Sequence, residues 1–288
     1  MRNSPTHNRT GKGAILSIAG SDPSGGAGIQ ADLKTFTSIG VYGGAAITCL
    51  TAQNTMGVAA LLPIDPDFVE QQISMVLADL PITHIKTGMM GTGEITAAVG
   101  RALLNFSGEI ICDPVLKASD GHDLLSPRDL SVWRNQLLGK ATIITPNLPE
   151  LVAISQRAIF SGQEAIEAGK SVLAEFTNLR GLIITGGHLH EDAEQIEDFL
   201  LIKEKGPIIL HKAKHRRIAT ANTHGTGCTF ASAFAAFNLL SGDYYDAFLK
   251  TTAYMDCLLQ RSSGISLGKG KGPLSHHLAT TKSAIGQD

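Results

Sequence analysis

Short apolar runs alternate with longer helical segments along most of this chain, and this alternation limits the folds open to it. The runs 14–19, 44–50, 141–145 and 181–185 have the length and apolar character of buried strands, and 84–87 and 109–112 are shorter candidates. Helical spacing or helix start and stop signals mark 28–39, 67–78, 126–138 and 161–176. Strands that alternate with helices form βαβ units, so the sequence predicts an α/β fold with a mainly parallel central sheet and helices on both faces.

The rest of the chain fits the same scheme. Segments 197–202 and 207–210 indicate a hairpin, and 226–240 and 244–262 indicate two final helices. Nothing between residues 14 and 275 looks like a linker, so we expect a single domain there, with a disordered lead-in over residues 1–13 and a tail over 276–288.

Composition excludes several classes of protein. The 288 residues are 43% hydrophobic and 17% charged, as in a soluble globular protein with a large core. A formal net charge of −2 provides no general basic field, so we expect no nucleic-acid partner, and no apolar run is long enough to predict a membrane segment. The four cysteines form no C-x-x-C pair, which favours reduced thiols in a cytoplasmic protein.

A glycine-rich turn, Ser21–Gly28, follows the first predicted strand and leads into a helix. Its glycines let backbone N–H groups approach a ligand at the helix N-terminus, where an anionic or oxygen-rich group is favoured. The turn matches neither the Walker P-loop nor the dinucleotide-binding pattern. By itself it is equally well explained as a tight connection between strand and helix.

A second glycine-rich segment, Asn222–Thr229, opens the helix predicted over 226–240. The backbone N–H groups at Gly225 to Cys228, with Thr226 and Gly227 between them, would point out of the helix end and form an anion hole. Such a hole stabilises the charge that develops on a transferred phosphoryl group. Cys228 lies in the first turn, where the helix dipole lowers a thiol pKa, so it is either a general base or a small buried residue.

Polar side chains also follow three other predicted strands. Asp113 comes after 109–112, and Asn147 and Glu150 come after 141–145. Carboxylates at these strand ends can hold Mg²⁺, although capping or surface roles are common for isolated acids. Gln53 lies in a polar loop after 44–50, where its amide could pair with an aminopyrimidine edge or simply form a turn.

Taken together and in this order, these segments resemble the hydroxymethylpyrimidine and phosphomethylpyrimidine kinases of thiamin biosynthesis, within the ribokinase superfamily. The resemblance is carried by IAGSDPSGGAGIQADLKTF, TAQNT, KTGMMG, DPV, TPNLPE, GGH, NTHGTGCT and GKGKGP, which run from about residue 18 to residue 273. It implies a ribokinase-like fold and transfer of the γ-phosphate of ATP, with Mg²⁺, to the hydroxymethyl group of a pyrimidine and to its monophosphate. It also implies a homodimer.

The resemblance implies a role for each matching residue. Those that line the pyrimidine pocket are Gly20, Ala27, Asp32, Gln53, Met89 and Val115, with Gln53 and Asp32 as its polar members. Gly225 and Gly227 supply the anion hole, and Cys228 takes the place of the catalytic aspartate of sugar kinases. Asp113 and Glu150 match the magnesium-linked acids. Asn147, Thr185, Thr226 and Lys269 fall at ATP or phosphate positions, and His224 shapes its loop.

The sequence departs from this family at its cations. Thr185 and Ala221 stand where relatives usually carry lysine, and the lysine after the DPV motif is displaced to Lys117. Lys117 and Lys269 are candidates to compensate. Because the second phosphorylation handles more negative charge, it is the step that these departures affect most.

Two alternatives stay open at this point. Gln53 favours an aminopyrimidine but does not exclude the pyridine ring of a vitamin B6 substrate, so a pyridoxine or pyridoxal kinase is the first. The second, a non-catalytic pyrimidine sensor, follows from the missing lysines, and the retained Gly225, Gly227, Cys228 and acids argue against it.

Overall fold

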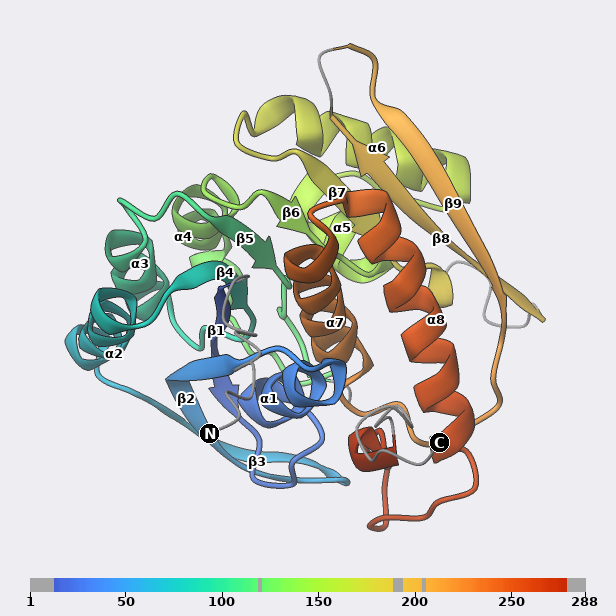
Figure 1. The fold of residues 1–288 in the computed structure, drawn as a ribbon, viewed down its shortest axis with the longest axis horizontal. Helices are drawn as coiled ribbons and strands as arrows, with labels where there is room; N and C mark the ends of the chain where they lie inside the picture. Colours follow the sequence, from blue (N-terminus) through green and yellow to red (C-terminus); the bar gives the residue numbers. More distant parts are fainter. Residues whose placement is uncertain (1–12, 119–120, 189–193, 204–205, 279–288) are drawn as a thin grey trace, which may run out of the picture.

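The computed structural model describes residues 13–118, 121–188, 194–203 and 206–278 (Figure 1). Within them, nine strands form one sheet in the order β3-β2-β1-β4-β5-β6-β7-β8-β9. The strands are β1 (Ala14–Ser21), β2 (Gly43–Asn54), β3 (Gly57–Pro63), β4 (Ile82–Thr87), β5 (Glu109–Cys112), β6 (Ile143–Ile144), β7 (Gly181–Ile184), β8 (Gln195–Ile202) and β9 (Ile209–Arg216). The central pairings from β2 to β7 are parallel, and β3, β8 and β9 pair antiparallel. The predicted α/β class with a mainly parallel sheet is confirmed.

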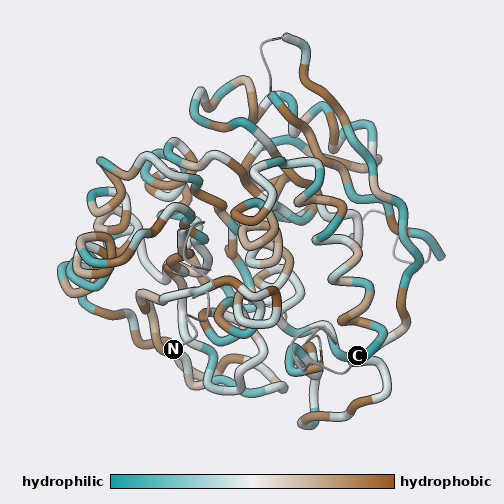
Figure 2. The backbone as a smooth tube through the Cα atoms, in the orientation of Figure 1, coloured by the Kyte–Doolittle hydropathy of each residue, from teal (hydrophilic) through white to brown (hydrophobic). Residues whose placement is uncertain are grey.

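Helices cover both faces of this sheet (Figure 1). One layer is α1 (Gly28–Ile39), α7 (Thr226–Ser241) and α8 (Tyr244–Ser262); the other is α2 (Pro66–Asp79), α3 (Gly93–Ala102), α4 (Leu130–Trp133), α5 (Leu148–Ser155) and α6 (Gly162–Glu175). Alternation along β1 divides its side chains between the layers, since Ile15 packs with the first and Leu16 with the second. Hydrophobic stretches follow the central strands and the inner helix α7 (Figure 2).

Local signals account for helix bounds that the sequence predicts correctly. Helix α1 ends at Gly40, which adopts a left-handed conformation with φ 87°. Helix α8 begins after Asp243, whose side chain accepts a hydrogen bond from the Asp246 backbone N–H.

Four expectations need correction. The helix expected over 126–138 is a 3₁₀ turn, the short α4 and a π-helical turn at Arg134–Leu138 in succession. The segment 51–55 is no loop after a strand, because β2 continues to Asn54 and pairs with β3, a strand that the sequence analysis did not anticipate. Helices α3 and α5 were also missed. The tail starts later than residue 276, because the turn His276–Leu278 packs on the domain and His276 is 2% exposed.

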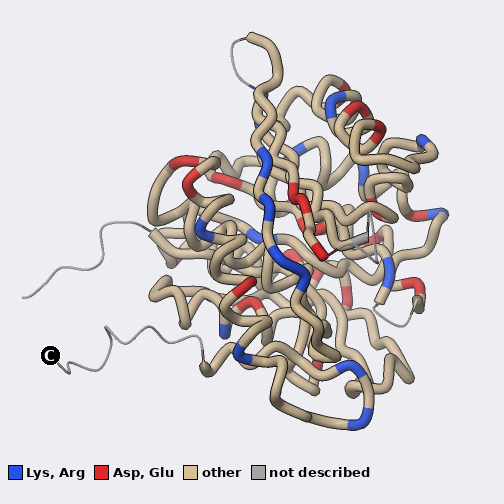
Figure 3. Tube along the Cα trace, turned by 90° about the vertical axis from the view of Figure 1, so that its right-hand side faces the viewer, with Lys and Arg blue, Asp and Glu red and all other residues tan. Residues whose placement is uncertain are grey.

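The two ends of the sheet differ in character. Edge strand β3 is largely apolar, whereas edge strand β9 carries Lys212, Lys214 and Arg216 on its exposed side, visible as a line of basic residues in Figure 3. Charged residues on an edge oppose pairing with another chain.

None of the helices in the described part of the chain combines the length and the apolar character that a membrane span requires. The remainder of the expected lead-in (1–12) and tail (279–288) lies outside the described residues.

Candidate active site

The carboxyl ends of the parallel strands meet at one edge of the sheet, and the predicted site residues follow them there. Asp22 follows β1 and organises the glycine-rich turn. Its Oδ1 accepts hydrogen bonds from the backbone and hydroxyl of Ser24, at 2.8 and 2.7 Å, and its Oδ2 accepts from the N–H groups of Gly26 and Ala27. Burial by itself raises the pKa of Asp22, but the hydrogen bonds from His224 and Ser24 outweigh it and lower the pKa to about 2. Asp22 therefore holds the turn as a carboxylate.

His224 joins the two glycine-rich segments. Its Nε2 lies 2.8 Å from Asp22 Oδ2, across 202 positions of sequence. The segments touch so closely that glycine is required on both: a Cβ at Gly26 would stand 2.4 Å from His224 Cδ2, and one at Gly225 would stand 1.8 Å from the Gly26 carbonyl oxygen. The turn Ser21–Gly28 and the segment Asn222–Thr229 are thus one structural unit, which supports the predicted role of His224.

The N-terminus of α7 faces this unit. Gly225 is the residue before the helix and has φ 81°, a conformation that glycine adopts without strain. The first N–H groups of a helix have no intrahelical acceptor. That of Thr226 donates to the Thr223 carbonyl at 3.4 Å, which leaves those of Gly227 and Cys228 for a ligand at the helix end. Gly227 is exposed, and a Cβ there would stand 3.9 Å from Asp113 Oδ1. The structure therefore brings the expected anion hole and the acid after β5 together.

A buried ion cluster, Lys86–Asp32–Asp113, lies beneath the anion hole. Lys86 is completely buried, with its Nζ 3.0 Å from Asp32 Oδ1 and 3.6 Å from Asp113 Oδ2. Burial alone would lower the pKa of Lys86, but the Asp32 carboxylate, then Cys228 and Asp113, raise it above its usual value. Lys86 is therefore a fixed cation next to the helix end.

Asp32 does not face an open pocket. It is completely buried, and Ser17 Oγ donates to its Oδ2 at 2.6 Å while Ser232 Oγ donates to its Oδ1 at 2.7 Å. With Lys86 as a third partner, both of its oxygens are occupied. The expectation that Asp32 is a polar member of the pyrimidine pocket is corrected: Asp32 supports the site from below.

The thiol of Cys228 also differs from expectation. Cys228 lies in the first turn of α7 and is half-buried. Burial raises its pKa to about 12, and the Asp113 and Asp32 carboxylates add to this rise while Lys86 opposes it. The expected lowering by the helix dipole is therefore outweighed, because desolvation and two nearby anions disfavour the thiolate.

Asp113 lies close enough to Glu150 to raise the pKa of Glu150. For Glu150, burial and then the Asp113 carboxylate raise the pKa well above its usual value; for Asp113, burial raises it more than Lys86 lowers it. Asp113 Oδ2 is buried and accepts no hydrogen bond from the described residues. Within the same residues, no group of three or more His, Cys, Asp and Glu side chains could hold a metal ion. The pair fits Mg²⁺ that takes its other ligands from phosphates and water.

Asn147 links this pair to β7. It is the residue before α5, and it forms a reciprocal capping box with Glu150: Asn147 Oδ1 accepts the Glu150 N–H at 3.0 Å, and Glu150 Oε2 accepts the Asn147 N–H at 2.9 Å. Asn147 also pairs with Thr185, the residue after β7. Two of the expected ATP or phosphate residues are therefore neighbours of Glu150, one of the two acids expected to bind magnesium.

Several of the residues expected to line the pyrimidine pocket lie close together. A Cβ at Gly20 would stand 3.0 Å from Met89 Sδ, and Met89 shares a small apolar cluster with Cys49, Leu124 and Val115. Ala27 belongs to the turn that Asp22 holds. Gln53 Nε2 lies 3.2 Å from His224 Nε2, so Gln53 is at the junction of the two glycine-rich segments and does not form a turn.

A third glycine-rich segment, Gly268–Gly272, contacts both Thr55 and His224. Thr55 Oγ1 accepts the N–H groups of Lys269 and Gly270, each at 3.2 Å. His224 N donates to the Gly272 carbonyl at 3.1 Å. The segments TAQNT, NTHGTGCT and GKGKGP, far apart in sequence, are therefore in direct contact.

The two lysines expected to compensate for the missing cations have different surroundings. Lys117 forms an exposed ion pair with Asp123 at 3.2 Å, whereas Lys269 is exposed on the segment beside Thr55. The sequence analysis missed Lys86, although it lies in the quoted motif KTGMMG. A lysine in an otherwise buried strand is a signal that could have identified it, because such a charge requires partners.

A model of the phosphomethylpyrimidine kinase family matches residues 22–275. This chain belongs to that family. A hydroxymethylpyrimidine/phosphomethylpyrimidine kinase of Escherichia coli (strain K12) is 40% identical over 91% of this chain and 96% of its own. A thiamine biosynthesis bifunctional protein of Geobacter sulfurreducens is 36% identical over 93% of this chain, which corresponds to 53% of its own length.

Solved structures give the same result for the fold of this family member. A pyridoxal kinase from Bacillus subtilis in an ADP complex has a TM-score of 0.81 at 31% identity, covering 92% of this chain and 98% of its own. A phosphomethylpyrimidine kinase from Clostridium difficile 630 has a TM-score of 0.72 at 33% identity, covering 85% and 98%. The predicted ribokinase-like kinase fold and family are confirmed.

Proposed function

We propose that this chain is an ATP-dependent kinase that phosphorylates 4-amino-5-hydroxymethyl-2-methylpyrimidine, and then its monophosphate, in thiamin biosynthesis. The observation that carries the proposal is the anion hole at the start of α7, placed beside Asp113 and over the buried cation of Lys86. Phosphoryl transfer depends mainly on positioning and on stabilisation of charge, and this arrangement provides both. Family membership supports the substrate class.

In this mechanism, the N–H groups of Gly227 and Cys228 donate to the transferred phosphoryl group, and Lys86 adds positive potential from below. Asp113 and Glu150 would hold Mg²⁺, which would neutralise charge on the phosphates. Cys228 accepts the proton of the substrate hydroxyl. Asp113 raises the pKa of the Cys228 thiol, so pairing of Asp113 with a cation favours the thiolate.

The nucleotide lies against the segment that leads into α7. We assign the base of ATP to a hollow lined by Ala221, Asn222, the segment 263–267 and Gly270, because Asn222 belongs to the segment that leads into α7. Thr185 and Asn147 lie at the phosphate side, where the Asn147 amide can donate to an oxygen. Pyridoxal kinases with the same fold have been solved as ADP complexes, which supports nucleotide binding by this fold.

The proposal is tested by incubating the purified protein with Mg-ATP and hydroxymethylpyrimidine and following the products by mass. We expect both the mono- and the diphosphate, since Lys86 keeps a cation under the phosphoryl site. Monophosphate alone would show that the lysines replaced at Thr185 and Ala221 are needed for the second step. Absence of any product, with tight pyrimidine binding, would contradict the proposal that the protein is a kinase.

Pyridoxal is the second candidate substrate, and the similarity to pyridoxal kinase structures favours it. The two substrates are separated by comparing kcat/KM for hydroxymethylpyrimidine and pyridoxal under the same conditions. We expect a preference for the pyrimidine, and a strong preference for pyridoxal would overturn the first choice.

We also propose that the enzyme is a homodimer and works in the cytoplasm. Edge strand β3 and its turn expose Met56 at 64% and Leu62 at 62%, an apolar edge of the kind that a second copy can cover. All four cysteines are free, as in a reducing compartment.

The dimer predicts a mass in solution of twice the 30.3 kDa chain. Leu62→Lys should convert the protein to monomers, because it places a charge on the covered edge. Light scattering after gel filtration measures both, with Leu104→Lys, an exposed leucine on another part of the surface, as the control. A wild-type monomer at micromolar concentration would contradict the proposal.

A further inference from the structure

A histidine clamped between two carboxylates, His215, lies on the α8 side of the β8–β9 hairpin. Its Nε2 is 3.2 Å from Asp198 Oδ2, and its Nδ1 is 3.1 Å from Asp256 Oδ1. The side chains of His215 and Asp198 are 14% and 6% exposed, and that of Asp256 is 29% exposed. Asp256 Oδ1 accepts no aligned hydrogen bond from the described residues, so its approach to Nδ1 is an ion-pair contact.

This geometry specifies where the protons are. A neutral imidazole carries one N–H, so its other nitrogen would turn a lone pair toward a carboxylate. The imidazolium carries two and attracts both acids. Burial lowers the pKa of His215, but Asp198 and Asp256 outweigh it and raise the pKa above 6.5, in agreement with the contacts.

Asp198 connects His215 to the nucleotide side of the sheet. While its Oδ2 faces His215, its Oδ1 accepts the N–H of Gly186 at 2.7 Å in a buried position. Gly186 opens the turn Gly186–His188 directly after Thr185. The turn is packed tightly on β8, since a Cβ at Gly186 would stand 2.0 Å from the Glu197 carbonyl oxygen. Asp198 therefore anchors the turn together with Arg217, whose side chain donates to the Gly187 carbonyl at 3.2 Å.

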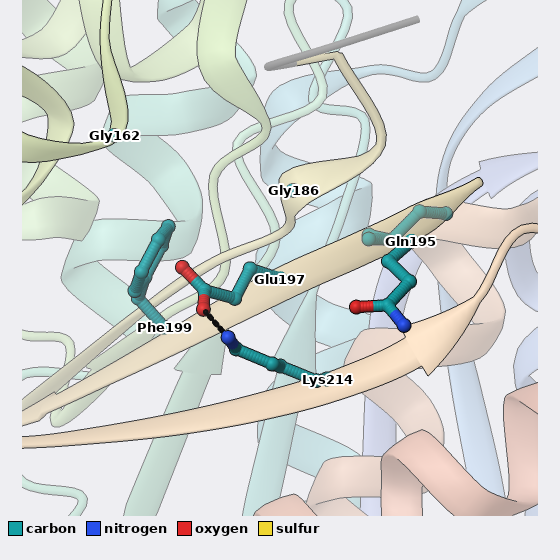
Figure 4. A pocket seen from close by; sticks show the side chains of 7 residues that line it. Gly162, Gly186, Gln195, Glu197, Phe199 and Lys214 are labelled. Atoms are coloured by element: carbon teal, nitrogen blue, oxygen red, sulfur yellow. Dashed lines mark ion pairs between the residues drawn. The ribbon is translucent and has the colours of Figure 1, made fainter. Parts of the chain in front are cut away.

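Other charged groups nearby have different partners. On the opposite face of the hairpin, Lys212 and Lys214 pair with Glu197, as Figure 4 shows for Lys214, and Arg216 points to that face as well. On α8, Lys250 pairs with Asp246, and Arg261 donates to the Leu278 carbonyl. On β9 itself, His211 stacks on Tyr245. Within the described residues, the charged groups that contact His215 are thus Asp198 and Asp256.

We propose that His215 is a positioning residue for the nucleotide: when doubly protonated, it fixes Asp198 and thereby holds the turn Gly186–His188 ready for ATP. This inference rests on the proposed function, because it takes that turn as part of the ATP site. The direction of the pH dependence follows from the raised pKa of His215. The contacts of the imidazolium with the two carboxylates are complete below pH 6.5, and they are lost as the pH rises through the higher pKa that His215 has in the folded state.

The test compares wild type with His215→Gln and Asp256→Asn between about pH 6 and pH 9, a range that spans histidine titration. For wild type we expect the KM for ATP to rise at alkaline pH by roughly tenfold, the effect of one charge-assisted hydrogen bond, while kcat changes little. His215→Gln should have the high KM throughout and no inflection. Asp256→Asn should move the inflection to lower pH, because one anion that favours the imidazolium is gone.

His211→Gln is the matched control, because it removes an imidazole from the same face of the same strand. Among the residues that the structure describes, His211 forms no ion pair with a carboxylate like those of His215. This variant should show the same dependence of the KM for ATP on pH as the wild type. Hydrogen exchange of a peptide containing Gly186 provides a readout without nucleotide, and we expect faster exchange in His215→Gln.

Each outcome has one reading. Equal KM profiles and equal exchange in wild type and His215→Gln would overturn the inference while leaving the kinase intact. Faster exchange at Gly186 without any change in KM would overturn the role of the turn in ATP binding. A wild type that does not bind ATP would overturn the proposed function and, with it, this role for His215.

Discussion

Replacing Lys86 with methionine should destabilise the protein by about 3–5 kcal/mol, the effect of removing one partner from a buried ion pair. Lys86 is the cation that contacts both Asp32 and Asp113, and all three are buried. Without it, two carboxylates would remain in the interior with no opposite charge. Urea unfolding, followed by circular dichroism, measures the change in free energy.

Two further variants make the Lys86 result specific. Lys250→Met is the matched control, since it removes a lysine from an exposed ion pair with Asp246 and should leave the unfolding midpoint unchanged. Adding Asp32→Asn to Lys86→Met should recover part of the loss, because one unpaired charge disappears. A Lys86→Met protein as stable as wild type would contradict the description of Lys86 as a required internal cation.

Cys228→Ala should lower kcat by roughly two to four orders of magnitude, the usual contribution of a positioned general base. Cys228 is the one titratable side chain in the first turn of α7, directly beside the anion hole. The KM for ATP should change little, because the backbone N–H groups that meet the phosphate are retained. Steady-state kinetics with saturating pyrimidine and varied ATP separate the two constants.

Cys257→Ala is the control for loss of a thiol, since Cys257 is a half-buried cysteine on α8 away from the anion hole. It should keep the wild-type kcat. If Cys228→Ala retained more than about a tenth of the wild-type kcat, the thiol would be a packing residue, and positioning by the anion hole would account for the catalysis.

The sequence predicts much of the fold because its signals are local. Gly40 and Asp243 mark the end of α1 and the start of α8, and short apolar runs mark the central strands. The predictions of secondary structure were wrong where contacts with other parts of the fold determined the backbone conformation. Segment 126–138 has a helical pattern, but it is divided into 3₁₀, α and π turns. Residues 51–54, three of which are polar, extend β2 because β3 supplies partners for their backbone.

The motifs by themselves identified the family. They also put most candidate residues at one edge of the sheet, because parallel strands deliver the residues after their carboxyl ends to one place. Only the tertiary structure decided how these residues are charged and paired. Asp32, expected in the pocket, is below it because Lys86, Ser17 and Ser232 occupy its oxygens. The thiol of Cys228, expected to be acidic, has a raised pKa. Contacts such as His224 with Asp22 join residues 202 positions apart, and burial and ion pairing arise only when the folded chain brings such residues together.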